Sequence, residues 1–528
     1  MAIFQISAWK RMSSKNILAL ILIANTCAVA YEGYAQGVIG IANSAPDYLN
    51  LVGIAVNGSG QADRVITQGG ITSIYYLGTI AGCVLAGWLS DKFGRVIALQ
   101  FGALWCMLGI ALEASAYNQP WIICARLIAG VGVAHMNCVA PTWVGEISEA
   151  AHRGKLFALV YLSNYIGIAL AYWIGFGLSY VDQGQSAIRW RLPFALNALP
   201  PLMLFCLLPF LPESPRYLMS AGRPEESLEV LAHVRAEGDS SNSAVLEEYH
   251  EIEQSVQQAK TQASTSSFMA LIWGSTSGKL HFPRRTQLAL WLPLFTQVGT
   301  GIAATTIYTP TLIRQAGWGA EKALWLSALN NTVGVLGTVI AMYTIDPVGR
   351  RPTLLWGSLA QSACMWIIGA MSVLTASRPS QATQYGSATV AFIFVFTLIY
   401  SSTFLIINFN YPAEIFPTEV RSRGMAFGIS GWAIGLGAGT LYNPVMFNSI
   451  GGYGFFVYGG LNLLWFVLIY LFLPETSRRS LEAVNRLFEI KSPFVRDMER
   501  HYRQYEDAGT AASEDNMSGK VEERAVHY

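Results

Sequence analysis

Residues 87–95 read Gly-Trp-Leu-Ser-Asp-Lys-Phe-Gly-Arg, and residues 346–351 repeat the end of this pattern as Asp-Pro-Val-Gly-Arg-Arg. A single charged motif beside an apolar stretch is usually only the solvated end of a helix. Here two more pairs of charged motifs follow in the same order and at a nearly constant offset: Glu146 with Arg153 and Glu414 with Arg421, then Glu213 with Arg216 and Glu475 with Arg478. Three pairs repeated in register indicate two halves of common design.

The composition places both halves in a membrane. The chain has 528 residues, of which 52% are hydrophobic and 13% are charged, whereas soluble proteins carry about 25% charged residues. Such a chain cannot cover itself with polar surface, which excludes a water-soluble enzyme, a disordered protein and a secreted disulfide scaffold. A net charge of +1 gives no excess of basic residues that would favour nucleic acid as a partner. The seven cysteines lie in apolar stretches and match no metal-binding spacing.

Twelve stretches are long and apolar enough to cross the roughly 30 Å core of a bilayer as helices. The expected spans are 17–40, 69–90, 96–116, 121–142, 155–180, 192–211, 286–312, 323–345, 353–374, 388–412, 424–447 and 454–473. The expected fold is an all-α membrane protein with twelve transmembrane helices in two pseudo-symmetric six-helix bundles. A polar stretch between the sixth and seventh spans is expected to form one or two amphipathic helices over 223–260.

Basic residues gather in the loops on one side of these spans, and the positive-inside rule assigns that side to the cytoplasm. The opposite loop over 41–68 then faces outwards and carries the glycosylation sequon that begins at Asn57. The expected organisation is a cytoplasmic tail over 1–16, a bundle over 17–211, a cytoplasmic helical linker over 212–285, a second bundle over 286–473 and a cytoplasmic tail over 474–528.

The motifs as a set resemble those of the major facilitator superfamily, and within it the sugar porter family and its fungal members. The resemblance covers residues 17–488. The matching stretches are Gly33–Gly37, Arg126–Gly132, Glu146–Ser148, Pro212–Arg216, Gln297 with Gly301, Asp346–Arg351, Glu414–Pro417 and Pro474–Thr476. This family resemblance implies two bundles that rock about a central site and expose it alternately to each side of the membrane.

The resemblance also implies a gate on the cytoplasmic side, in which ion pairs tie helix ends of the two halves together. Its members in this chain are Asp91, Arg95, Glu146, Arg153, Glu213, Arg216, Asp346, Arg350, Glu414, Arg421 and Glu475.

The expected substrate pocket matches the family only in part. Its candidate residues are Gln297, Tyr161, Asn164, Tyr308, Phe409, Asn410 and Trp432. Four positions at which the family carries amide side chains hold smaller or apolar residues instead, namely Val298, Ala303, Gly334 and Gly431. Because several hydrogen-bond partners of a glucose-like ligand are missing, the pattern leaves open a hexose, a pentose, a polyol, a sugar acid or a non-sugar metabolite.

Energy coupling is the second open question. Proton-coupled relatives carry an aspartate in the first span, paired with the arginine represented here by Arg126, but this chain has Ala35 at that position. Glu32 stands three residues earlier on the same helical face, so its carboxylate is the candidate replacement. Proton symport and facilitated diffusion both remain open.

The sequence therefore predicts a secondary transporter that moves a small hydroxylated solute, most often a sugar, across the plasma membrane, with the solute and the lipid bilayer as its partners, joined by protons in the case of symport. An exporter of a specialised metabolite and a sugar sensor are the alternatives. No nucleophile–base set, metal-ligand spacing or phosphate-binding loop points to an enzyme or to a cofactor.

Overall fold

The structure is a computed structural model, and it describes residues 7–54, 64–147, 153–184, 186–261, 271–272, 281–416, 420–477, 479, 481–490 and 492–504. Within these ranges every regular element is a helix. Asn57 lies outside the described residues, so its predicted glycosylation is not addressed by the structure.

The first half of the chain forms one bundle of six crossings. Five crossings are single helices, and the sixth is divided after Leu196, close to the Pro200-Pro201 pair, which cannot supply backbone donors to a continuous helix. The crossings are α1 (Ser14–Ala42), α3 (Val65–Phe93), α4 (Arg95–Ala114), α5 (Gln119–Ile147), α6 (Arg153–Leu178) and α7 (Ile188–Leu196) with α8 (Leu199–Leu207). Short helices η1 (Ser7–Arg11), α2 (Pro46–Leu51), η2 (Val181–Gly184) and η3 (Leu208–Phe210) flank them.

The second half repeats this arrangement, with the break in its first crossing. Gly301 has φ of +89°, a backbone conformation that favours glycine, and it separates the first two pieces of that crossing. The crossings are α13 (Phe282–Gly299) with α14 (Ile302–Ile307) and α15 (Thr309–Gln315), then α16 (Ala320–Val348), α17 (Arg350–Ser377), α18 (Ala382–Ile415), α19 (Arg421–Ile450) and α20 (Gly454–Phe472). The turn η6 (Pro379–Gln381) connects α17 to α18, and the turn η7 (Gly451–Tyr453) connects α19 to α20.

The twelve predicted spans correspond to these crossings. Ten segments of the described chain are long and apolar enough to cross a membrane, and one of them contains both α19 and α20. The span predicted over 286–312 is divided into α13, α14 and α15, and it is absent from that set. Large apolar side chains such as Leu77, Leu104, Leu336 and Trp366 are exposed on the outer surface, as expected of helices that face lipid.

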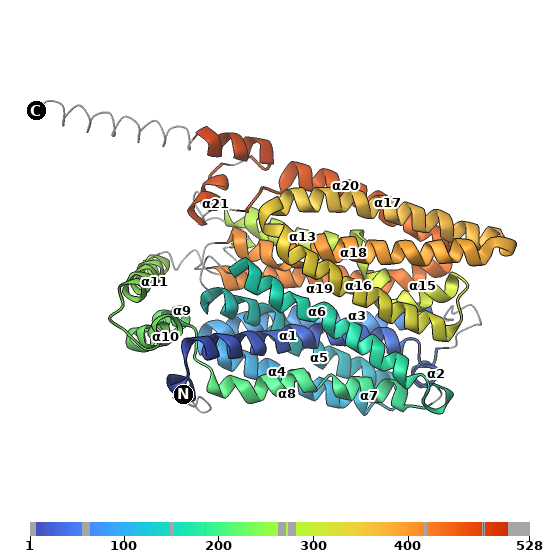
Figure 1. Cartoon of the computed structure of the whole chain (residues 1–528), viewed down its shortest axis with the longest axis horizontal. Coiled ribbons are helices and arrows are strands. Elements are labelled where there is room, and N and C mark those ends of the chain that lie inside the picture. Colours follow the sequence, from blue (N-terminus) through green and yellow to red (C-terminus); the bar gives the residue numbers. More distant parts are fainter. Residues whose placement is uncertain are drawn as a thin grey trace, which may run out of the picture.

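The polar segments lie together at one end of the bundles (Figure 1). The stretch predicted to hold one or two amphipathic helices contains α10 (Pro224–Ala236) and α11 (Ser243–Thr261), preceded by α9 (Pro215–Ser220). The same end carries α1's first turn, α21 (Leu481–Leu487) and a helix over 495–504. The linker helices and the last described helices therefore share one side of the membrane region.

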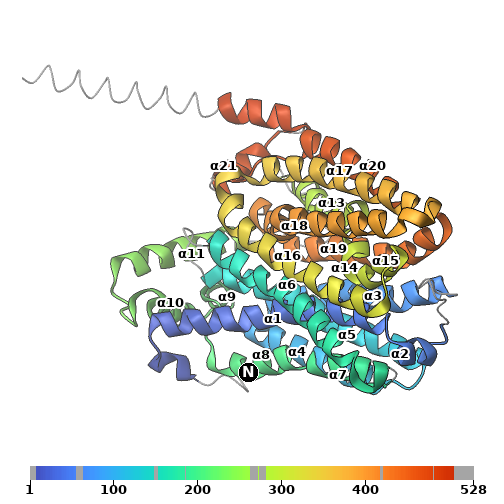
Figure 2. The same ribbon diagram turned by 45° about the vertical axis from the view of Figure 1, so that its right-hand side comes forward.

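The two bundles lie side by side along their length (Figures 1 and 2). Within the first bundle α1 packs on α6, and both α3 and α4 pack on α5. Between the bundles α3 packs on α19, and α6 packs on α16. Small residues allow these close approaches: a Cβ on Gly33 of α1 would lie only 1.9 Å from the backbone oxygen of Asn164 on α6. This close approach of α1 and α6 brings Glu32, the neighbour of Gly33, within hydrogen-bonding distance of Asn164.

Candidate functional site

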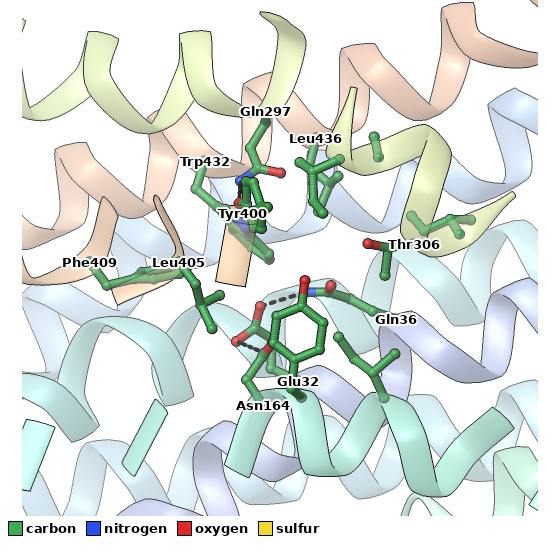
Figure 3. Close-up of a pocket in the computed structure, with 15 residues that line it drawn as sticks. Glu32, Gln36, Asn164, Gln297, Thr306, Tyr400, Leu405, Phe409, Trp432 and Leu436 are labelled. Atoms are coloured by element: carbon green, nitrogen blue, oxygen red, sulfur yellow. Dashed lines mark hydrogen bonds between the residues drawn. The ribbon is translucent and has the colours of Figure 1, made fainter. Parts of the chain in front are cut away.

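A pocket lies between the two bundles, midway along their helices (Figure 3). Its cavity volume is about 30 Å³, enough for about two water molecules. Its walls therefore have to separate before a sugar-sized solute can bind. The lining side chains are Glu32, Gln36, Asn164, Tyr165 and Ile168 from the first bundle, and Gln297, Ile302, Ala303, Thr306, Ile307, Tyr400, Leu405, Phe409, Trp432 and Leu436 from the second.

The first bundle contributes a carboxylate held by two amides. Gln36 donates its Nε2 hydrogen to Glu32 Oε1 at 2.6 Å, and Asn164 donates from Nδ2 to Glu32 Oε2 at 3.0 Å. Gln36 is one turn after Glu32 on α1, while Asn164 comes from α6. Both side chains fix the carboxylate beside the cavity, as Figure 3 shows. Glu32 is 1% exposed, so this charged group is almost completely withdrawn from solvent.

The second bundle contributes one amide and several rings. Gln297 on α13 donates from Nε2 to the hydroxyl of Tyr400 on α18 at 3.1 Å. Phe409 and Trp432 form a wall near these groups, with ring centroids 6.1 Å apart. The pocket thus has an acidic, amide-lined side and an aromatic side, an arrangement that suits a solute with hydroxyl groups on a compact carbon frame.

The pocket is closed towards the end that carries the linker. There Tyr161 of α6 stacks on Phe409 of α18, with ring centroids 4.7 Å apart and an angle of 23° between the planes. Phe157 extends the stack on the side of the first bundle. Tyr161 was predicted to bind substrate, but it lies behind Phe409 and does not line the pocket. Its position instead makes it part of a plug between the bundles.

The pocket is also closed towards the opposite end. Tyr172 of α6 donates its hydroxyl hydrogen to the backbone oxygen of Thr306 on α14 at 2.7 Å, which joins the bundles. Tyr308, another predicted substrate residue, donates to the backbone oxygen of Thr440 at 2.9 Å and lies beyond the pocket. Because the interface is closed on both sides, the structure has an occluded arrangement.

Four of the predicted pocket residues and Glu32 do come together: Asn164, Gln297, Phe409 and Trp432 all line the cavity. Sequence reasoning missed Gln36, Tyr165, Thr306 and Tyr400. The position of Gln36 could have been found, because it lies four residues after Glu32 on the same helix and therefore on the same face. The other three carried no signal beyond their place in an apolar span.

Arg126 does not pair with Glu32, which corrects the expected coupling pair. Its Nη1 lies 3.3 Å from Oε1 of Glu113 on α4, and each of these two side chains is 2% exposed. The physical reason is the direction of each side chain: Glu32 points towards α6, where amide groups bind it, whereas Arg126 points towards α4. Glu113 is buried together with Arg126.

Arg126 also contacts a chain of aromatic rings. Its guanidinium lies 4.4 Å from the centre of the Tyr75 ring. Tyr75 meets Tyr76 edge-on at 5.3 Å, and Tyr76 meets Trp432 edge-on at 5.5 Å. The buried ion pair of the first bundle is thereby connected through packed rings to a wall of the pocket in the second bundle.

The repeated charged motifs form one cluster in each bundle. In the first bundle Arg95 binds Glu146 through two nitrogens, at 2.7 and 2.9 Å. Glu213 accepts the backbone N–H groups of Arg95 and Val96 at 2.8 and 3.1 Å. Arg216 is partly buried at the start of α9, and only the backbone of Arg153 is described.

The second bundle repeats these contacts. Arg350 binds Glu414 at 2.8 Å, and Glu475 accepts the backbone N–H groups of Arg350 and Arg351 at 3.0 and 2.9 Å. Asp346 adds a second ion pair with Arg350 at 2.8 Å. Asn410 donates to Glu414 at 2.7 Å, so this predicted substrate residue belongs to the charge cluster and not to the pocket.

These clusters show where the predicted gate residues lie. The motifs were expected to pair between the bundles, but the contacts just described lie within one bundle, because each motif joins the ends of neighbouring helices. An ion pair between described residues does cross the interface: Arg423 Nε lies 3.2 Å from Asp91 Oδ2. Arg421, which was predicted for the gate, is buried at the start of α19 two residues before this crossing arginine.

The described residues contain no group of three or more His, Cys, Asp or Glu side chains placed to hold a metal ion. The chemistry that this part of the chain offers is that of hydrogen bonds, one pocket carboxylate and aromatic surfaces.

Comparison with known proteins agrees with this geometry. The family model described as "Sugar (and other) transporter" matches residues 20–488. The chain is 31% identical to the MFS-type transporter criB of Aspergillus cristatus, over 80% of this chain and 84% of the relative. It is 27% identical to the MFS glucose transporter mfs1 of Aspergillus flavus, over 85% and 86% of the two chains. It is 28% identical to the quinate permease of Neurospora africana, over 87% and 86%.

A similar fold is found among solved structures. The proton:xylose symporter XylE bound to 6-bromo-6-deoxy-D-glucose superposes with a TM-score of 0.74 at 22% identity, covering 90% of this chain and 100% of that one. This likeness shows the fold of the major facilitator superfamily. Together with the family match over most of the chain, it establishes that the protein is a multi-pass membrane transporter and belongs to the sugar transporter family.

Proposed function

We propose that this protein carries a small, neutral, hydroxylated solute together with a proton across the plasma membrane, with both termini in the cytoplasm. The observation that supports this proposal is the position of Glu32 in a pocket shared by the two bundles. Because the protein belongs to a family of transporters, we also propose that no covalent step occurs at this site.

The charge balance of the pocket supports a proton as the coupled ion. Glu32 is the one ionisable acid or base among the described residues that line the cavity, apart from the tyrosines. A buried carboxylate without a counter-charge costs several kcal/mol. A proton taken up with the solute removes this cost during the passage through the occluded arrangement, and its release lets Asn164 and Gln36 bind the charged form.

The same carboxylate favours neutral solutes. Before the proton binds, a sugar acid would place a second negative charge beside the ionised Glu32, and like charges in a dry site repel each other by several kcal/mol. The hydroxyl groups of a sugar or polyol can instead donate to the carboxylate and pair with Asn164 and Gln297. We therefore place pentoses, hexoses and polyols ahead of quinate-like acids as substrates.

The orientation follows from charge. The end that carries α9–α11 and the charged clusters is rich in arginine, and the positive-inside rule assigns it to the cytoplasm. Labelling of an epitope tag at either terminus in intact and in permeabilised cells tests this, and labelling in intact cells would contradict it.

Uptake measurements test the transport proposal. Cells without their own hexose carriers would express the wild-type protein, Glu32→Gln or the control Glu321→Gln, which removes an acid at the opposite end of the fold. We expect the wild type and Glu321→Gln to accumulate a labelled pentose, hexose or polyol, and a protonophore to abolish accumulation. Glu32→Gln is expected to exchange solute without accumulating it.

Four results would change the proposal. Full accumulation by Glu32→Gln excludes this residue from the proton path. Uptake that never exceeds equilibrium in the wild type indicates facilitated diffusion. Faster transport of quinate than of any neutral solute would overturn the substrate assignment, and net efflux of a metabolite from preloaded vesicles would favour an exporter.

A further inference from the structure

A second hollow lies far from the transport pocket, where the helix over 495–504 meets the ends of α17 and α20. It has a volume of about 840 Å³. Its side chains are Arg351, Tyr470, Leu471, Phe494, Val495, Arg496, Asp497, Glu499, Arg500, Arg503 and Gln504. The elements that form this hollow, namely the first turn of α17, the last turn of α20 and the helix over 495–504, lie at the end of the molecule that carries the linker, as Figure 1 shows.

One face of the 495–504 helix anchors it to the bundle. Val495 and Met498 are buried, and Glu499 binds Arg479 through two contacts at 2.7 and 2.8 Å. Phe494 stacks on Phe472 at the end of α20, with ring centroids 5.6 Å apart. The helix is therefore held in place against the membrane-spanning part of the protein.

The other face of this helix is strongly basic. Arg496, Arg500 and Arg503 follow each other at intervals of four and three residues, so they share one face. All three are exposed, and among the described residues none of them forms an ion pair. Like charges at this spacing destabilise an isolated helix by about 0.2–0.5 kcal/mol per pair, which an anion bound between them would relieve.

A fourth arginine faces the same hollow from the bundle. Arg351 donates from Nη2 to the backbone oxygen of Tyr470 at 2.8 Å and lies over the Tyr470 ring. Its Nε is buried and has no hydrogen-bond partner within the described structure. Of the two acids in the hollow, Glu499 is neutralised by Arg479 and Asp497 accepts from Ser492. Four arginines thus face one unpaired acidic charge.

The hollow continues into the lipid-facing surface. Leu463, Val467 and Tyr470 follow each other along one face of α20, and each is exposed, Tyr470 by 58%. Phe494, at the edge of the hollow, is also exposed. A basic hollow at the end of an exposed apolar stripe matches a molecule with an anionic head and an apolar chain.

We propose that this hollow binds the headgroup of an anionic phospholipid from the membrane leaflet on this side, with an acyl chain along Leu463, Val467 and Tyr470 of α20. Arginine forks suit phosphate oxygens because they donate two hydrogens in one plane. The lipid would hold the 495–504 helix against α17 and α20.

Binding of short-chain lipids to the purified full-length protein in detergent tests this proposal. The probes are dioctanoyl phosphatidylinositol bisphosphate, dioctanoyl phosphatidylserine, dioctanoyl phosphatidylcholine and free inositol trisphosphate. We expect the bisphosphate lipid to bind most tightly and phosphatidylcholine least. Arg500→Ala/Arg503→Ala should weaken anionic-lipid binding about 25-fold, or about five-fold per arginine, whereas Arg500→Lys/Arg503→Lys should retain most of it.

Lys322→Ala/Arg378→Ala is the matched control, since it removes two exposed positive charges at the opposite end of the fold. It should bind lipid as the wild type does. Equal affinity of the wild type and the alanine pair would overturn the proposal. Equally tight binding of free inositol trisphosphate and of its lipid would also overturn it, because the site would then be one for soluble phosphates. Should the alanine pair fail to fold, Arg503→Ala alone is expected to lose about five-fold, and unchanged binding would overturn the proposal.

Discussion

Glu113→Gln removes the counter-charge of Arg126 and leaves this arginine buried. The two side chains are 3.3 Å apart and 2% exposed, so no solvent is available to replace the lost carboxylate. Breaking such a pair costs about 3–5 kcal/mol. The Tyr75 ring, 4.4 Å from the guanidinium, contacts Arg126 in both proteins and therefore does not change this difference. At about 2–4 °C per kcal/mol for a bundle of this size, the melting temperature should fall by on the order of 10 °C.

A double-mutant cycle isolates this effect. The protein would be purified in detergent and its unfolding followed by intrinsic fluorescence for the wild type, Glu113→Gln, Arg126→Gln and the double variant. Removing both charges leaves no isolated ion, so the double variant should be more stable than either single variant. Glu321→Gln, which changes an exposed acid, controls for the substitution itself. A Glu113→Gln protein that melts within 2 °C of the wild type (roughly 1 kcal/mol), or additive losses in the double variant, would refute the reasoning.

Three further predictions follow from other contacts. Gly33→Ala would place a Cβ 1.9 Å from the α6 backbone and cost about 1–3 kcal/mol by overpacking; solute uptake should fall, whereas Gly70→Ala, which meets no neighbour within 4 Å, should transport normally. Arg423→Ala removes the partly exposed pair with Asp91, worth about 0.2–1 kcal/mol, so a cysteine introduced into the pocket should be labelled about 1.4- to five-fold faster from that side; an unchanged rate contradicts this role. Burial raises the pKa of Glu213 above its ordinary value of 4.5, although backbone N–H groups oppose the shift. Its contribution to stability is therefore complete below pH 4.5 and is lost as the pH rises through the raised pKa, so the melting temperature of Glu213→Gln should vary less with pH over this window, and parallel curves for the two proteins would contradict it.

The repeated motifs predicted the local structure of both bundles because that structure depends on short segments. Gly94 and Gly349 have φ of +97° and +98°, and each turns the chain between two crossings. Glu213 accepts the backbone N–H of Arg95, which begins α4 after Gly94. Glu475 accepts the backbone N–H of Arg350, which begins α17 after Gly349, in the same way. Apolar length was likewise sufficient to place the crossings.

The partners of buried charges could not be predicted in the same way. Sequence spacing shows which residues share a helical face, but it does not fix how each helix is rotated against its neighbours. Arg126 could meet Glu32 on α1 or Glu113 on α4, and packing places it with Glu113. For the same reason the gate residues were assigned between the bundles, whereas most of their described contacts lie within one bundle.

The positions that have lost the family's amides explain the narrow pocket. They do not leave empty space. A Cβ on Gly334 would lie 2.1 Å from the Tyr165 ring, so that ring occupies the place of the missing side chain. A Cβ on Gly431 would lie 2.1 Å from the backbone oxygen of Leu290, so the helices α13 and α19 approach closely there. At these two positions no side chain is present to form a hydrogen bond, and the space is filled by the Tyr165 ring and by the Leu290 backbone. A solute that enters this pocket therefore meets closely packed walls and the Glu32 carboxylate.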